Sequence, residues 1–122
     1  MAVDALYLLH DCLESFGYPV FLQGSMTADE SYPASFFTYY NNTTGGALFY
    51  DNLENANVWD FDVNAYSANP DTAQEMLLEA RNALRAIGFV VTGAGYDIMS
   101  DEPTHVGRGI NAIYLERVSV NG

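Results

Sequence analysis

One stretch of eleven residues constrains the fold more than any other part of the chain. Residues 57–67, NVWDFDVNAYS, alternate apolar and polar side chains without interruption at the centre. The two sets occupy opposite faces of an extended chain: Trp59, Phe61, Val63 and Ala65 against Asp60, Asp62 and Asn64. This period-two alternation predicts a half-buried β-strand, typical of an antiparallel sheet with one face in water.

Two helices are expected, one on each side of this strand in the sequence. Residues 3–16 carry apolar side chains at steps of three and four, and Gly17 follows as the residue that ends the helix. The second helix starts where Asn69 can act as a cap and Pro70 fits the first helical position. Its apolar stripe ends at Gly88, which predicts the C-terminus of the helix.

The remaining ordered stretches are rich in β-branched and aromatic residues, which predicts further strands. These stretches are 19–24, 32–41, 47–51, 89–99 and 110–120, of which 89–99 contains a glycine-rich bulge or break. The sequence therefore predicts an α+β fold, with a mostly antiparallel sheet of four to six strands packed with two helices. A single domain spanning residues 1–122 is expected.

The charge of the chain argues against several classes of function. Aspartate and glutamate number 16, arginine and lysine together number 4, and the formal net charge is −12. Binding to DNA or to an anionic membrane surface needs clustered basic residues, so neither kind of binding is expected. No stretch reaches the ~18 apolar residues of a membrane span. The acidic excess fits either solubility alone or a surface that lies near nucleic acid without binding it.

Residues 100–109, SDEPTHVGRG, concentrate reactive side chains in a segment expected to be a loop before the last strand. Asp101, Glu102 and His105 could supply zinc ligands, but no further ligand shows a pairing signal. A hydrolytic triad would need a nucleophile held by the histidine, and only sequence neighbours are available. We therefore expect no catalytic site, metal or cofactor, and interpret the segment as a polar or interaction loop.

Two other motifs fail on their spacing. The stretch DFDVN begins like a calcium loop, but Ala65 stands where that loop needs glycine and Asp71 where it needs a bidentate glutamate. The stretch TGAGY, residues 92–96, lacks the third glycine and the following helix of a dinucleotide site. Neither motif predicts a ligand.

In this order of elements, the chain resembles the tail-terminator (tail-completion) proteins of long-tailed bacteriophages. The resemblance is carried by FGYPVF, YPASFFTYY, VWDFDVNAYSANPDTAQEMLLEARNALRAIGF and SDEPTHVGRGINAIYLER, and it covers almost the whole chain. It implies a structural virion protein of the tail or neck, present in the host cytoplasm during assembly, and no enzyme. The absence of lysine is a departure from the family that the resemblance does not account for.

The resemblance also implies an assembly. Such proteins form a ring, usually a hexamer, that caps the finished tail tube and docks it to the head connector. The expected partners are other copies of the chain, the tail tube protein and the connector protein, while DNA passes through without specific binding. The alternatives are another neck or head-completion protein, and a small-molecule binding or hydrolytic domain that uses residues 100–108.

The family offers no catalytic residues to carry over, so two surface predictions rest on the residues alone. Asp101, Glu102, His105 and Arg108 are expected to contact a neighbouring subunit or a neck partner. Asp60 and Asp62 are expected to contribute to an acidic lumen that repels the phosphates of passing DNA.

Overall fold

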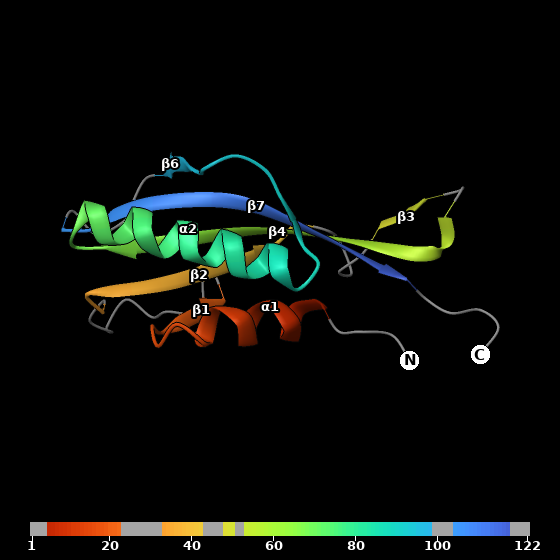
Figure 1. The fold of residues 1–122 in the computed structure, drawn as a ribbon, viewed down its shortest axis with the longest axis horizontal. Coiled ribbons are helices and arrows are strands. Elements are labelled where there is room, and N and C mark those ends of the chain that lie inside the picture. Colours follow the sequence, from red (N-terminus) through yellow and green to blue (C-terminus); the bar gives the residue numbers. More distant parts are fainter. Residues whose placement is uncertain (1–4, 23–32, 43–47, 51–52, 99–103, 118–122) are drawn as a thin grey trace.

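The computed structural model describes residues 5–22, 33–42, 48–50, 53–98 and 104–117. Within these ranges the chain forms two helices and one seven-stranded sheet (Figure 1). The elements in chain order are α1 (Ala5–Glu14), β1 (Val20–Leu22), β2 (Ser35–Asn41), β3 (Leu48–Tyr50), β4 (Leu53–Ser67), α2 (Pro70–Ala86), β5 (Val90–Val91), β6 (Tyr96–Ile98) and β7 (Val106–Arg117).

The sheet has the order β1-β2-β4-β7-β5, with β3 paired to β4 and β6 paired to β7. The β1–β2 pair is parallel and the other described pairs are antiparallel. The predicted α+β class, with a mostly antiparallel sheet and two helices, is therefore confirmed. The sheet has one strand more than the upper expectation because the 89–99 segment divides into β5 and β6. Gly93 and Gly95, at φ 76° and 97°, turn the chain between them.

Strand β4 is the long central element on which the rest of the sheet is assembled. Along one edge, residues 61–67 of β4 pair with β2. Along the other edge, residues 56–67 pair with β7. Phe61, Val63 and Ala65 are completely buried on the face that meets the helices. The alternation seen in the sequence is strong here because a central strand with one covered face must keep its apolar side chains in register.

Both helices begin or end at the residues that local chemistry favours. Asn69 Oδ1 accepts hydrogen bonds from the backbone N–H groups of Asp71 and Thr72, at 2.9 Å and 3.4 Å, and Pro70 starts α2. Gly17 after α1 and Gly88 after α2 adopt positive φ angles of 86° and 106°. The predicted boundaries of α2 are confirmed, whereas α1 ends at Glu14, two residues before the predicted end at residue 16.

The core lies between the sheet and the helices, which pack together on one face of it (Figure 1). Its buried side chains come from α1, α2 and the helix-facing sides of the long strands. They include Leu9, Leu13, Phe37, Phe61, Val63, Met76, Leu77, Leu84, Phe89 and Ile110. No helix in the described ranges is long and apolar enough to cross a membrane.

The sheet is longer than the helix layer that covers it. Figure 1 shows β3 and the adjoining ends of β4 and β7 extending past the ends of both helices. We call these three strand segments the β-projection. The part of the sheet under the helices and the β-projection are continuous through β4 and β7.

Candidate functional site

The end of the reactive segment belongs to the sheet. Strand β7 starts at Val106, so the prediction that residues 106–109 form a loop is wrong. The glycines there are required by packing and not by a turn. A Cβ atom on Gly109 would lie 2.8 Å from Asn64 Oδ1 and 2.9 Å from a ring carbon of Tyr96. Asp101 and Glu102 lie outside the described residues.

His105 connects the beginning of β7 to the chain just before β2. Its Nε2 donates to the carbonyl oxygen of Pro33 at 2.7 Å, which leaves Nδ1 to accept from the Thr104 hydroxyl at 3.0 Å. The ring also packs against Phe36, with centroids 5.9 Å apart. Both ring nitrogens are thus bonded within the chain, an arrangement that suits a structural contact better than proton transfer.

Arg108 points to the helix side of the sheet and bonds within its own chain. Its Nε donates to Gln74 Oε1 at 2.7 Å and its Nη1 to Asp97 Oδ1 at 2.6 Å. The side chain is 20% exposed. The expected contact of Arg108 with another subunit stays a prediction, and such a contact would have to share a guanidinium that already joins β7, α2 and β6.

Two other arginines make the same kind of connection. Arg81 donates to the Gly93 carbonyl at 3.0 Å, and Arg85 donates to the Val91 carbonyl at 2.8 Å. Three arginines therefore hold the β5–β6 segment against α2. Sequence reasoning does not find these contacts, because the acceptors are backbone carbonyl oxygens, which every residue type carries.

Replacing Arg108 by alanine is expected to lower the free energy of unfolding by about 1–3 kcal/mol, because charge-assisted hydrogen bonds to two side chains are lost. Backbone amides of β6 should also exchange faster, since that strand loses its connection to α2. Urea denaturation and hydrogen exchange measure the two effects. Asp97→Asn is the matched control: it keeps an acceptor oxygen and removes an exposed charge, for a change below about 1 kcal/mol. Unaltered exchange in β6 would contradict the assignment.

The opposite face of the sheet carries a second cluster, which we call the acidic sheet face: Tyr40, Asp60, Asp62, Tyr96 and Asn111. Asn111 Nδ2 donates to Asp60 Oδ1 at 2.6 Å and lies 3.3 Å from Asp62 Oδ1. Tyr40 and Asn111 are the cross-strand neighbours of Asp62 on β2 and β7. The cluster thus joins side chains from β2, β4, β6 and β7 on the face without helices.

The electrostatics of this cluster are set by its carboxylates. Burial raises the pKa of Tyr96, and the negative charges of Asp62 and Asp60 raise it further. The phenol is therefore protonated at neutral pH, and its hydroxyl lies within the field of both carboxylates. Tyr96 and Tyr40 remain 45% and 50% exposed.

The expectation of a uniformly wet face is correct only in part. Asp60 and Asp62 are partly exposed, but Asn64 is 7% exposed and donates to Thr38 Oγ1 at 3.4 Å. Asn64 is covered because the Tyr96 ring lies over Gly109, its neighbour on β7. The lumen role of Asp60 and Asp62 stays a prediction.

The described residues offer little for metal or nucleophile chemistry. They contain no group of three or more histidine, cysteine, aspartate or glutamate side chains placed to hold a metal ion. Burial raises the pKa of the Cys12 thiol, which disfavours the reactive thiolate. The side chains gathered at the acidic sheet face are suited to a contact with another surface, whereas the three arginines bond within the chain.

The comparisons with known proteins do not identify a relative. No protein-family model matches the chain, and no curated protein matches its sequence. Any function assigned to the chain therefore rests on its own residues and on the order of its elements.

Proposed function

We propose that this chain is a structural subunit of a bacteriophage tail that assembles as a ring, of six copies, at the head-proximal end of the tail tube. The ring would end tail growth and join the tail to the head connector. Support comes from the order of elements that resembles the tail terminators, and above all from one feature of the fold. That feature is the β-projection.

The β-projection is better suited to assembly than to an isolated domain. Figure 1 shows it beyond both helices, and a ribbon of a few strands is at best marginally stable in water by itself. Among the described residues no strand pairs with the outer edge of β3, so its backbone N–H and C=O groups there can pair with another chain. A neighbouring subunit in a ring would provide both the cover and the pairing.

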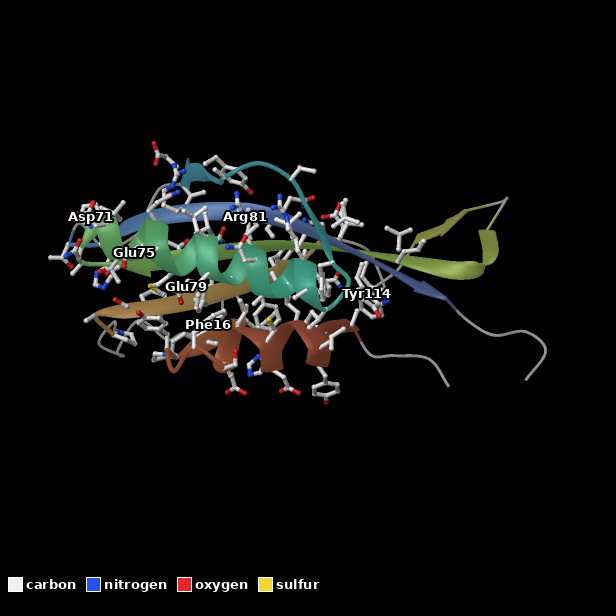
Figure 2. All side chains as sticks on the ribbon, viewed as in Figure 1. Phe16, Asp71, Glu75, Glu79, Arg81 and Tyr114 are labelled. Atoms are coloured by element: carbon white, nitrogen blue, oxygen red, sulfur yellow. The ribbon has the colours of Figure 1, made fainter. Side chains whose placement is uncertain are left out.

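Trp59 supports the same interpretation at the base of the β-projection. It lies on β4 opposite Tyr114, which Figure 2 labels near the C-terminal end of α2. Its buried indole Nε1 has no hydrogen-bond acceptor among the described residues. A buried donor without a partner costs about 1–3 kcal/mol. Because this nitrogen is covered by its own chain, an acceptor from an adjacent subunit would reach it only if the β-projection shifted on assembly, and such a shift would remove this cost.

The distribution of charge fits a ring through which DNA passes freely. Three of the four arginines donate hydrogen bonds to acceptors of their own chain, so fewer of their N–H groups are free to bind phosphates. Figure 2 shows Asp71, Glu75 and Glu79 following one another along α2, and all three are exposed. Such a row would repel phosphate within roughly one Debye length, ~8 Å at physiological salt. It is a more exposed candidate for a lumen wall than Asp60 and Asp62.

Phage particles that lack this protein should show heads separated from tails, with tails of irregular length, because nothing ends tube growth or joins the two parts. Electron microscopy of lysates measures both features, and supplying the intact gene in trans is the control. Separated heads with tails of uniform length would instead indicate another neck or head-completion protein. Normally joined particles would show the proposal to be wrong.

The hydrolytic or small-molecule alternative at residues 100–108 receives less support. Both ring nitrogens of His105 are bonded, and the Arg108 guanidinium is engaged by Gln74 and Asp97. A substrate would have to displace these contacts before either side chain could act on it.

A further inference from the structure

The acidic sheet face has a chemistry that ring formation alone does not require. Its two carboxylates lie beside two half-exposed tyrosines on a sheet face that neither of the two described helices covers. We propose that the acidic sheet face docks a second, basic protein that places an arginine side chain over Asp60 and Asp62. This inference does not depend on the ring, and it assigns these two residues to a protein contact in place of the lumen.

The carboxylates of Asp60 and Asp62 are held by neutral donors. Asn111 serves both, and the Asn42 amide donates to Asp60 Oδ1 at 3.2 Å. The ion pairs among the described residues are His10–Glu14 and Arg108–Asp97, so neither neutralises this face. Two like charges on the same side of one strand repel each other, and a cation placed between them would relieve the repulsion.

The tyrosines favour a guanidinium in particular. Tyr40 is the direct cross-strand neighbour of Asp62, and the negative charges of Asp60 and Asp62 both act on Tyr96. A cation over an aromatic ring gains roughly 0.5–2 kcal/mol, depending on how far it is desolvated. Arginine can stack on such a ring while its planar fork donates to carboxylates, whereas lysine offers a point charge.

We expect the arginine to come from a different protein. The chain contains no lysine, and three of its four arginines, Arg81, Arg85 and Arg108, bond within their own chain, so a second copy could offer only Arg117. The formal charge of −12 on each copy opposes the docking of one copy onto the acidic sheet face of another. A basic partner has the complementary charge, so it would be attracted from a distance and its binding would weaken as salt is added.

The test is an NMR titration of the full-length, ¹⁵N-labelled chain with N-acetyl-arginine amide. N-acetyl-citrulline amide is the matched probe, since it has nearly the same shape and no charge. We expect shifts concentrated on the acidic sheet face, including the Asn111 side-chain amide, with the arginine probe alone. Added salt should weaken them. Equal shifts with both probes, or arginine shifts spread evenly over the acidic surface, would overturn the proposal.

Two variants separate a specific contact from overall charge. Asp60→Asn with Asp62→Asn should weaken binding of the arginine probe at least about tenfold, or ~1.4 kcal/mol. Glu75→Gln with Glu79→Gln removes the same number of charges from the exposed side of α2 and should leave the affinity within about twofold of wild type. Each single aspartate change is measured as well, with the spectrum as the check on folding. Equal weakening by both pairs would mean that only net charge matters.

A second copy of the chain is the competing occupant. If the signals of the acidic sheet face move with protein concentration in the absence of any probe, the face joins copies of this chain and the proposal is wrong. The phage experiment tests ring formation without reference to this face. The two proposals can therefore fail separately.

Discussion

Replacing Phe61 by alanine is expected to lower the free energy of unfolding by about 3–5 kcal/mol. Phe61 is completely buried at the centre of β4, and its ring stacks on Trp59 at a centroid distance of 6.0 Å. It also contacts Phe89 at 6.3 Å, so the change leaves a cavity between the sheet and the chain after α2. A domain of this size has about 5–15 kcal/mol of stability in total. Urea or thermal unfolding followed by circular dichroism measures the loss.

Tyr40→Ala is the comparison for this prediction. Tyr40 is an aromatic residue of the adjacent strand β2, but half of its side chain is exposed and it lies on the face without helices. Its removal should cost about 1 kcal/mol or less. Similar losses at Phe61 and Tyr40 would show that the core is not where we place it.

Gly95→Ala is the second change with a large expected effect. A Cβ atom at Gly95 would overlap Leu77 Cδ2 and approach the Gly109 carbonyl oxygen to 3.2 Å. The residue also has φ 97°, which side chains rarely adopt. Overpacking of a filled core costs about 1–3 kcal/mol and the backbone strain about 1–2 kcal/mol. We therefore expect a loss of about 2–5 kcal/mol in chemical denaturation.

Gly93→Ala separates the two causes. Gly93 has φ 76°, but nothing lies within 4 Å of the position of its Cβ atom. Only the strain contribution of about 1–2 kcal/mol should remain. If both alanine variants were equally destabilised, the contact between Gly95 and Leu77 would not be responsible.

Several elements of the fold could be predicted because their signals are local. The cap formed by Asn69, the proline that starts α2 and the glycines that end both helices act through neighbours a few residues away. The alternation in β4 likewise reports which side chains face the core, since that periodicity follows from the pleat of a single strand. The boundaries of α2 and the central position of apolar residues in β4 therefore follow from short stretches of sequence.

Only part of the acidic sheet face could be predicted from such local signals. Alternation placed Asp60 and Asp62 on one face, but it carried no information about Tyr40, Tyr96 or Asn111. Those side chains reach the carboxylates through the pairing register of β2, β6 and β7. Register depends on which strands meet and in what alignment, and this is decided by packing across the whole sheet.

The sequence by itself determined the helix ends, the alternation of β4 and the acidic character of the surface, because these follow from composition and from interactions between near neighbours. Tertiary structure alone decided the bonding of Arg108, whose partners Gln74 and Asp97 are 34 and 11 residues away. It also decided that Gly109 lies in a strand, under the Tyr96 ring. A glycine in a polar sequence is compatible with either a turn or a close approach between strands. The position of the Tyr96 ring against Gly109, which depends on the tertiary structure, shows that this glycine serves a close approach and not a turn.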